Sequence, residues 1–294
     1  MSPKHSKFKS ATLTPETIEI VQNSGTETPE SGKYCYTDLQ GSYLCRQCGK
    51  ALFKSQNKFI SKCGWPSFDD CIIDSIRELL DRDGYRTEIQ CNQCHAHLGH
   101  MFKGEQYTEK NIRYCVNSLA LDFTESTNII KTDEAIVAGG CFWGIEHLYS
   151  NVKGIVMTES GYCGGTISNP SYETVCHGLS GHYECVRILF DPAVITYIDV
   201  LKFFFEIHNP EQINGQGHDI GTQYQSAIFP YNLEQKEDTL KVLRELEKNN
   251  ILATTKIMNP CVFWPAESYH QKYLKKHPNA YCSHSYQKKF KDKD

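Results

Sequence analysis

The chain has 294 residues, a formal net charge of −4 and 14 cysteines. This length exceeds one typical domain and fits two, each large enough to bury its own core. The slightly acidic balance, without a long basic run, argues against nucleic acid as a partner. No apolar stretch approaches the roughly 18 residues of a membrane span, and no apolar core follows the charged start of the chain. We therefore expect a cytoplasmic protein with no membrane partner.

The pattern along the chain predicts two domains between polar ends. We expect a flexible tail over 1–33 with one short helix near 16–22, a mainly-β domain over 34–123, a linker over 124–133, a second domain over 134–286 and a charged tail over 287–294. The second domain alternates strands (135–138, 154–162, 183–190, 224–229) with helices (141–150, 197–207), and a surface helix follows over 233–249. This order predicts an α+β domain of the ferredoxin-like βαββαβ class.

Cysteines at this density without an export signal favour metal binding or redox chemistry over a secreted disulfide scaffold. Two Cys-x-x-Cys pairs stand in the first domain, and four thiolates can surround one zinc ion, which predicts a zinc-stapled domain with one structural Zn²⁺ per chain. The predicted ligands are Cys45, Cys48, Cys91 and Cys94. Two disulfides are the alternative, and Cys91 to His95 also has the spacing of a haem c attachment site, which would need export.

A cysteine also lies within an apolar stretch over 112–121 that reads as a strand. The two-residue period of a strand places Arg113, Cys115 and Asn117 on one face, so a cation and an amide would flank the thiol. Upstream, His97 and His100 supply two imidazoles that can donate protons near neutral pH. Structural hydrogen bonding is the alternative role for these histidines.

These segments, with Cys63-Gly-Trp-Pro-Ser-Phe68 and the two Cys-x-x-Cys pairs, resemble the B-type methionine sulfoxide reductases over 34–123. The resemblance implies a β-tent-like fold, in which Cys115 is the nucleophile and Cys63 resolves it. Trp65 would pack against the substrate methyl group, and Arg113 would hold the thiolate. The sulfoxide oxygen or its water would be positioned by His97, His100 and Asn117. Cys71 remains open as the resolving thiol. The sequence departs from the family in Ala96, where Ser is frequent, and in Lys103-Gly104, where acidic residues commonly follow the Phe.

In the second domain, a glycine pair ends an apolar strand and delivers Cys141 to an aromatic helix start. The free N–H groups of a first helical turn stabilise a thiolate, so we expect a lowered pKa for Cys141. A buried structural cysteine is the alternative. The order of motifs Gly-Cys141-Phe-Trp-Gly, Gly161-Tyr-Cys-Gly-Gly, Asn169-Pro-Ser-Tyr, Gly181-His-Tyr-Glu and Asp219-Ile-Gly-Thr-Gln-Tyr resembles the A-type methionine sulfoxide reductases over 135–286. The whole chain is thus similar to a fused bifunctional reductase, with the B-type domain first.

The residue types around Cys141 suit attack on a sulfoxide, because the departing oxygen needs a proton. We expect Glu184 to be the acid, kept protonated by burial among Tyr172, Tyr224 and other rings. The tyrosines would hydrogen-bond the oxygen, Phe142 and Trp143 would hold the S-methyl group, and Asp219 would orient the polar side. Packing in the core is the alternative for the aromatic residues.

The sulfenic acid left on Cys141 would condense with Cys282 in the C-terminal tail, and a thioredoxin-like donor would reduce the disulfide. We expect Cys163, Cys176, Cys185 and Cys261 to be bystanders. The predicted function is reduction of free or protein-bound methionine sulfoxide, the S epimer by the C-terminal domain and the R epimer by the N-terminal domain, in repair of oxidised proteins and with no organic cofactor bound. A zinc-stapled thiol redox sensor and a zinc-ribbon nucleic-acid adaptor are the alternatives.

Overall fold

The computed structural model describes residues 13–125, 127, 129 and 131–290. The chain divides into two compact units, Met1–Thr132 and Asp133–Asp294, called here the N-terminal and C-terminal units. Each is described by itself. Within the described residues, no helix has the length and apolar character to cross a bilayer.

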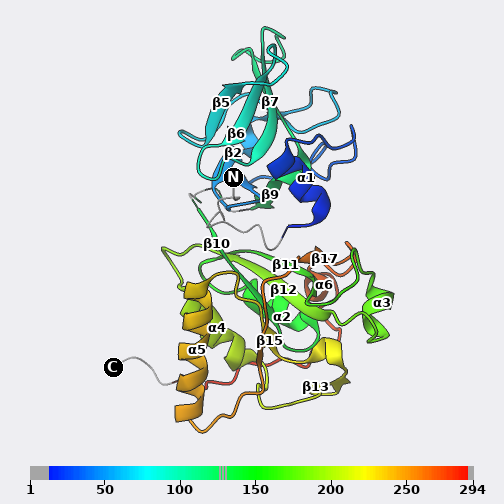
Figure 1. The fold of residues 1–294 in the computed structure, drawn as a ribbon, viewed down its shortest axis with the longest axis vertical. Coiled ribbons are helices and arrows are strands. Elements are labelled where there is room, and N and C mark those ends of the chain that lie inside the picture. The colour runs from blue at the N-terminus through cyan, green and yellow to red at the C-terminus, as the bar shows by residue number, and fades with distance from the viewer. Residues whose placement is uncertain (1–12, 126, 128, 130, 291–294) are drawn as a thin grey trace. The chain divides into compact units, whose positions relative to one another are not determined.

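The N-terminal unit is mainly β, as predicted, and contains two antiparallel sheets (Figure 1). The three-stranded sheet has the order β2-β1-β9, with β1 Ser42–Cys45, β2 Ala51–Lys54 and β9 Leu121–Thr124. The six-stranded sheet has the order β3-β4-β8-β7-β6-β5, with β3 Lys58–Phe59, β4 Ser67–Phe68, β5 Ile76–Leu80, β6 Thr87–Cys91, β7 His97–Lys103 and β8 Ile112–Val116. The short helices are α1 Pro15–Asn23, η2 Ser55–Asn57 and η3 Ser118–Ala120.

Aromatic side chains from both sheets form the core of this unit. Phe53 of β2 stacks on Phe68 of β4 with ring centroids 4.4 Å apart, and Tyr43 of β1 meets Phe68 edge-on at 5.0 Å. Each of these three side chains is fully buried. Burial on this scale stabilises the unit by about 2 kcal/mol for each large side chain.

The predicted N-terminal tail is wrong for residues 13–33. Thr14 caps α1 by accepting a hydrogen bond from the Thr17 N–H at 3.2 Å, and Ile20 and Val21 bury one face of the helix in the core. The short helix expected near 16–22 is confirmed as α1, and only its packing on the core was not anticipated. Residues 1–12 lie outside the described part of the chain.

The predicted strand over 112–121 is interrupted. β8 ends at Val116 in the six-stranded sheet, η3 follows, and the chain re-enters a strand, β9, in the three-stranded sheet. The interruption arises because the segment passes from one sheet to the other. Asn117 consequently leaves the face of the strand that carries Cys115.

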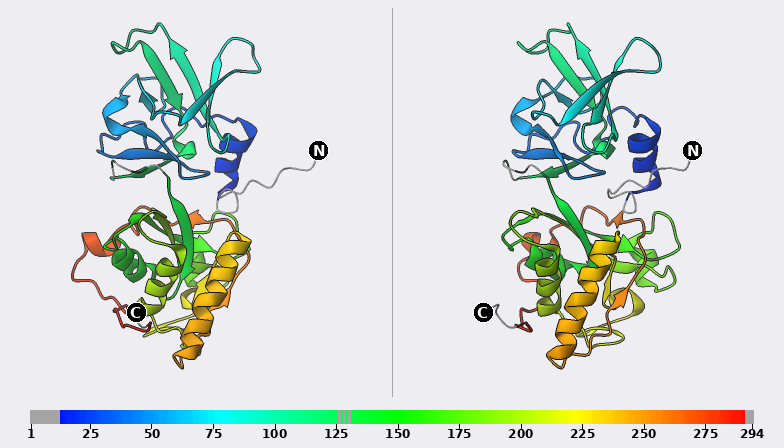
Figure 2. Two further views of the ribbon diagram at one scale, coloured as in Figure 1. Left: turned by 90° about the vertical axis from the view of Figure 1, so that its left-hand side faces the viewer. Right: turned by 60° about the vertical axis from the view of Figure 1, so that its left-hand side comes forward.

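The C-terminal unit is built on a six-stranded sheet of order β16-β15-β10-β12-β11-β17, seen in Figure 2 with its helices. Its strands are β10 Asp133–Ala138, β11 Ile155–Cys163, β12 Tyr183–Phe190, β15 Ala227–Ile228, β16 Lys256–Ile257 and β17 Trp264–Pro265, and β13 Gly215–Gln216 pairs separately with β14 Asp219–Ile220. The helices are α2 Phe142–Tyr149, α3 Tyr172–Cys176, α4 Tyr197–Ile207, η4 Thr222–Tyr224, α5 Leu233–Lys248 and α6 Tyr273–Lys276.

Alternation along the strands separates two cores. In β10, Ala135 and Val137 belong to the core that includes side chains of α2, α4 and α5, whereas Ile136 and Ala138 belong to a smaller core on the opposite face. The antiparallel pairing of β10 with β12 and with β15 fixes this register. The end of β10 is thereby held in place where Cys141 follows.

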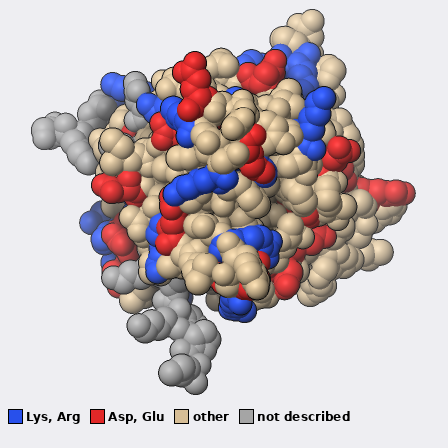
Figure 3. All heavy atoms as spheres, turned by 90° about the horizontal axis from the view of Figure 1, so that it is seen from above, with Lys and Arg blue, Asp and Glu red and all other residues tan. Residues whose placement is uncertain are grey.

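The predicted linker and C-terminal tail are both shorter in the structure. Thr124 still pairs in β9 and Asp133 already begins β10. Phe290 is buried, and the Lys289 N–H donates to Glu206 Oε1 at 3.1 Å, so residues 287–290 pack on α4. Residues 291–294 lie outside the described residues. On the face in Figure 3, acidic and basic side chains are interspersed.

Candidate functional sites

Four cysteines of the N-terminal unit converge, with their sulfur atoms within 4.8 Å of one another. The sulfurs of Cys45 and Cys94, and those of Cys48 and Cys91, are 3.6 Å apart. A tetrahedron with metal–sulfur bonds of about 2.3 Å has sulfurs roughly 3.8 Å apart, whereas a disulfide bond measures about 2.05 Å. The arrangement could therefore hold a metal ion, and both of these contacts join the two Cys-x-x-Cys pairs.

The two Cys-x-x-Cys turns have matching backbone geometry. The Gly49 N–H donates to the Cys45 carbonyl at 2.8 Å, and the His95 N–H donates to the Cys91 carbonyl at 2.9 Å. Both donors have positive φ, +73° for Gly49 and +62° for His95. Each turn therefore presents its two sulfurs toward the same point.

A row of functional side chains crosses the six-stranded sheet. In the strand register Glu88 of β6 lies opposite His100 of β7, His100 opposite Cys115 of β8, and Cys115 opposite Ser67 of β4. Directly opposed residues of antiparallel strands point to the same face. The structure thus brings His100 and Cys115 together, as predicted.

Cys63 lies beside Cys115, with their sulfurs 3.6 Å apart. The hydroxyl of Ser61 donates to Cys63 Sγ at 3.0 Å, and Ser67 Oγ lies 3.5 Å away. The hydrogen bond between the two sulfurs lowers the pKa of Cys63 to about 4, and the same hydrogen bond, followed by burial, raises the pKa of Cys115. The raised pKa of Cys115 runs against the expected resting thiolate on that residue.

Cys71 lies elsewhere. Its sulfur is 3.9 Å from Tyr114 Oη, and Tyr114 precedes Cys115 in β8, so the two side chains point to opposite faces of the sheet.

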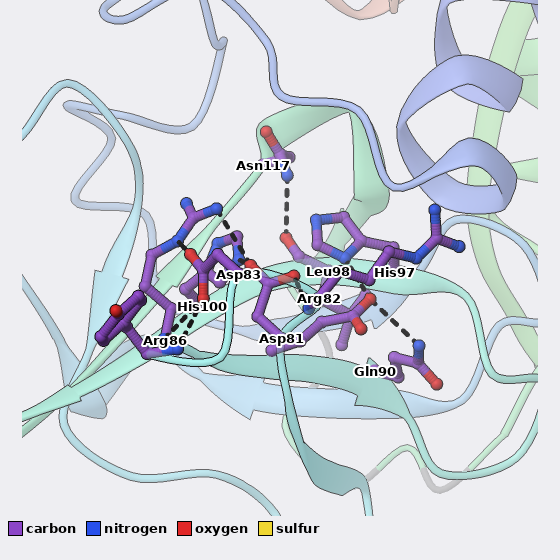
Figure 4. Close-up of polar contacts among 11 residues, drawn as sticks. Asp81, Arg82, Asp83, Arg86, Gln90, His97, Leu98, His100 and Asn117 are labelled. Carbon is purple, nitrogen blue, oxygen red and sulfur yellow. Dashed lines mark hydrogen bonds and ion pairs between the residues drawn. The ribbon is translucent and has the colours of Figure 1, made fainter.

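The two histidines are each held by a carboxylate, and Figure 4 labels both rings and Asp81, the partner of His100. His97 Nδ1 lies 2.6 Å from Glu88 Oε1, and His100 Nε2 lies 2.7 Å from Asp81 Oδ2. Burial lowers the pKa of His97. Among the described residues, its buried Nε2 atom has no hydrogen-bond partner. The sequence analysis missed Glu88 and Asp81, which act only through contacts across strands.

Arg113 forms a bidentate ion pair with Glu105, at 2.7 Å from Nε and 2.8 Å from Nη2. Its guanidinium also lies 4.4 Å from the ring centre of Phe102. This hydrogen bonding raises the pKa of Arg113, so the group remains cationic beside the thiol pair. Glu105, which directly follows the Lys103-Gly104 departure, thus supplies a nearby acidic partner.

Asn117 and Trp65 both contact the N-terminal segment. Asn117 Nδ2 donates to the Leu98 carbonyl at 3.1 Å (Figure 4), and its Oδ1 accepts from the Glu27 N–H at 3.0 Å. The indole N–H of Trp65 donates to the Glu27 carbonyl at 3.1 Å. Glu27 falls in the predicted tail and was missed for that reason.

In the C-terminal unit, Cys141 occupies the N-cap position of α2, and Gly140 before it has a φ of +102°. The first free helical N–H, that of Phe142, donates to Glu184 Oε2 at 3.1 Å. Burial, followed by the charge of Glu184, raises the pKa of Cys141. The predicted lowering of this pKa is wrong, because the helix terminus faces a carboxyl group and the thiol is desolvated.

Glu184, the second residue of β12, is almost fully buried. Burial raises its pKa to about 8, with a smaller contribution from the charge of Asp219. The predicted direction of this shift is confirmed. The carboxyl therefore keeps its proton at neutral pH, next to the start of the helix that carries Cys141.

Aromatic rings surround this end of α2. Trp143 stacks on Tyr273 with ring centroids 3.7 Å apart and donates its indole N–H to His270 Nδ1 at 3.1 Å, and the Tyr172 ring lies 4.3 Å from that of His270. Trp143 and Tyr172 are partly exposed, whereas Phe142 is fully buried in the core. Phe142 therefore packs against the other rings from the core side and is not itself exposed to a substrate.

Tyr172 and Tyr224 share the electrostatic surroundings of Glu184. Burial raises the pKa of each hydroxyl, and the charge of Glu184 adds to the shift in both. The charge of Cys141 also acts on Tyr224. Both phenols consequently remain protonated hydrogen-bond donors.

The C-terminal segment passes over α2 at Gly144. A Cβ atom at Gly144 would lie 2.3 Å from His284 Nδ1 and 2.9 Å from Cys282 Sγ, so only glycine fits. His284 Nε2 lies 2.8 Å from the Gly139 carbonyl, and the Ser283 hydroxyl donates to Asp219 Oδ2 at 3.2 Å. The exposed thiol of Cys282 thus lies one helical turn from Cys141. The sequence analysis missed His284 and Gly144, along with His270 and Tyr273.

Of the remaining cysteines of this unit, three lie in or against the smaller core, and Cys176 lies near Tyr172. Cys163 and Cys185 are fully buried in the smaller core, and Cys261 packs against it. Cys176 is the last residue of α3. Burial raises the pKa of its thiol, and a hydrogen bond with the Tyr172 hydroxyl offsets part of that increase.

Cys115 and Cys141 each lie among proton-donating groups. Each also has a second thiol nearby, Cys63 and Cys282. These features define a two-domain redox enzyme that acts through cysteine. Residues 133–294 match the family described as Peptide methionine sulfoxide reductase, and residues 13–125 match the SelR domain.

Relatives named peptide methionine sulfoxide reductase MsrA share the C-terminal half. That of Polynucleobacter asymbioticus is 44% identical over 160 residues (53% of this chain, 84% of the relative), and that of Nitratiruptor sp. is 48% identical over 155 residues (51% and 88%). Reduced Mxr1 of Saccharomyces cerevisiae superimposes with a TM-score of 0.51 at 34% identity, covering 53% of this chain and 92% of that one.

The chain belongs to the peptide methionine sulfoxide reductase family. It carries a SelR domain ahead of the family's own domain, and it reduces both epimers of methionine sulfoxide.

Proposed function

We propose that the C-terminal unit reduces the S epimer through Cys141 with Glu184 as the acid. The observation that carries this proposal is the buried carboxyl of Glu184, which accepts a hydrogen bond from the Phe142 N–H at the helix start that bears the thiol and has a pKa raised by burial. Sulfur of Cys141 attacks the sulfoxide sulfur while Glu184 gives its proton to the oxygen and recovers one from the thiol. The products are methionine and a sulfenic acid on Cys141, so the oxygen atom moves from one sulfur to the other.

The surrounding groups hold the substrate in this proposal. Trp143 offers an apolar surface for the S-methyl group, with His270 and Tyr273 fixing its ring. The hydroxyls of Tyr172 and Tyr224 donate hydrogen bonds to the oxygen as its negative charge grows. Asp219 acts through Ser283, which it anchors.

The second step condenses two sulfurs. The Cys282 thiol attacks the sulfenic sulfur of Cys141, and a disulfide and one water form. A thioredoxin-like dithiol then reduces the disulfide and becomes oxidised itself. The anchoring of the tail by His284 and the position of Cys282 at Gly144 support this assignment.

In the N-terminal unit we propose that Cys115 attacks the R epimer and that Cys63 resolves it. The sulfur separation of 3.6 Å supports this pair over one with Cys71. His100 and His97, each oriented by a carboxylate, supply the proton and position the oxygen or a water, and Trp65 packs the methyl group. Arg113 stabilises negative charge on the sulfur pair.

We further propose that Cys45, Cys48, Cys91 and Cys94 hold one structural zinc ion, because four thiolates at this spacing leave no open coordination position. The four predicted strands of the C-terminal unit correspond, in chain order, to β10, β11, β12 and β15. They lie side by side in the order β15-β10-β12-β11, which supports a ferredoxin-like assignment. The two sheets of the N-terminal unit support a β-tent-like fold. A cytoplasmic location fits thiols that must stay reducible.

The test of this division of labour uses single substitutions and both purified epimers. Cys141→Ser should lower reduction of the S epimer by at least about 1000-fold and leave the R epimer unchanged, and Cys115→Ser should do the converse. Each unit serves as the control for the other. Loss of both activities in either variant would refute the assignment.

A further inference from the structure

The N-terminal segment Glu27–Tyr34, called here the strap, contacts the Cys115 site at several points. Its first residue, Glu27, donates its N–H to Asn117 Oδ1 at 3.0 Å, and its carbonyl accepts from the Trp65 indole N–H at 3.1 Å. Its carboxylate accepts from the backbone N–H groups of Ser118 at 2.5 Å and Leu119 at 3.1 Å. Glu27 is buried, with 7% of its surface exposed. A buried carboxylate with this many partners is costly to place, and its contacts here all lead to one site.

The carboxylate caps η3, the turn that carries the chain from β8 out of the six-stranded sheet. Ser118 and Leu119 lead this short helix, and their N–H groups have no helical acceptors of their own. Without the carboxylate, the turn directly after Cys115 and Val116 would lose both acceptors. Glu27 therefore fixes the end of the strand that bears the nucleophile.

The main chain of the same residue links two groups of the site. Asn117 is held between the Leu98 carbonyl and the Glu27 N–H, and the Trp65 ring is oriented by its bond to the Glu27 carbonyl. Gly32 adds to this packing, since a Cβ atom there would lie 2.7 Å from Glu27 Oε1 and 2.2 Å from Ser118 Oγ. The strap thus fits closely onto the turn.

We propose that Glu27 is a positioning residue for the R-epimer site, which sets the ring of Trp65 and the turn at Asn117 so that the methyl pocket is formed before substrate binds. The proposal rests on the function proposed for Cys115. Because Trp65 contacts the methyl group in that function, loss of Glu27 should act mainly on substrate binding, and the chemical step at Cys115 should be less affected.

The test compares Glu27→Gln and Glu27→Ala with the control Glu30→Gln in the full chain. Glu30 lies in the same strap but is exposed, with its carboxylate accepting from the Tyr36 hydroxyl. Gln at position 27 keeps the shape of Glu but has only one acceptor oxygen. Its NH₂ group cannot accept from the second of the two backbone N–H groups at the start of η3, so that hydrogen bond is lost. Steady-state kinetics with the R epimer and dithiothreitol separate KM from kcat, and the S epimer reports on the other unit.

We expect KM for the R epimer to rise about tenfold in Glu27→Gln and further in Glu27→Ala, with kcat within about threefold and with Glu30→Gln unchanged. Unchanged KM in both Glu27 variants would overturn the proposal. So would a fall in kcat at constant KM that follows the fraction of unfolded protein in a thermal melt, since that result indicates stability alone. If the wild-type chain itself fails to reduce the R epimer, the function proposed for Cys115 fails first, and the two failures are thereby distinguished.

Discussion

The two thiol sites solve the same chemical problem with different electrostatics. In the N-terminal unit the thiol pair sits among full charges: Arg113 with Glu105, and two histidines with carboxylates. In the C-terminal unit burial raises the pKa of both Cys141 and Glu184, and the charge of Asp219 adds to both shifts. Ionisation is therefore favoured in the thiol pair of the N-terminal unit, where the pKa of Cys63 is lowered, whereas the C-terminal site favours the protonated form of Glu184.

The difference follows from the local fold. A mid-sheet strand exposes one face to cross-strand neighbours, so polar groups from β4, β6 and β7 can collect around Cys115. A helix start beneath aromatic rings excludes water, and exclusion of water favours neutral forms. Each of the following predictions would break or sharpen this contrast.

The largest effect is expected from the cysteine cluster, which is found in one unit only among the described residues. Structural zinc contributes on the order of 10 kcal/mol of apparent free energy, comparable with the whole free energy of unfolding of a domain. Cys91→Ser should therefore abolish reduction of the R epimer, unfold the N-terminal unit and leave reduction of the S epimer intact.

Native mass spectrometry should find about one zinc ion per wild-type chain and none in Cys91→Ser. Cys71→Ser, in the same unit but outside the cluster, is the control and should retain the metal. A wild-type protein without zinc, yet active on the R epimer, would contradict the four-thiolate site.

A smaller but still large effect is expected at Glu184. Since its pKa is raised to about 8, the acid form is present below that pH and is lost above it, and the charge that then appears raises the pKa of Cys141 further. The value of kcat/KM for the S epimer should fall as pH rises through about 8.

Glu184→Gln should lower kcat/KM for the S epimer by about 100-fold or more and remove that pH limb. Reduction of the R epimer provides the internal control, since Glu184 lies in the other unit. Retention of activity within about threefold would argue that another group protonates the oxygen.

The smallest effect separates the two resolving candidates of the N-terminal unit. Cys63→Ser should block thioredoxin-supported turnover of the R epimer while dithiothreitol, which attacks the sulfenic acid directly, still supports it. Cys71→Ser should stay within about twofold of wild type with either reductant, because its thiol lies on the opposite face of β8. The reverse pattern would assign resolution to Cys71.

Much of the site could be predicted from the sequence, because short motifs bring their residues together through local structure. The glycine pair before Cys141 and the two Cys-x-x-Cys turns adopt the expected positions in strand, helix start and turn. The expected strand through Asn117 failed where the chain changes sheets. Glu27, Glu88 and Asp81 escaped notice because their partners are far away in the sequence.

The sequence by itself determined the order of the elements, the two reactive cysteines and the four-cysteine cluster, since periodicity and close spacing are local properties. Only the tertiary structure decided which groups carry charge. Burial raised the pKa of Cys141, and the approach of Cys115 lowered that of Cys63. The same packing placed Glu27 and His284, which lie far along the sequence from the reactive cysteines, against the two sites. The physical reason is that desolvation and ion pairing depend on neighbours that a linear pattern does not contain.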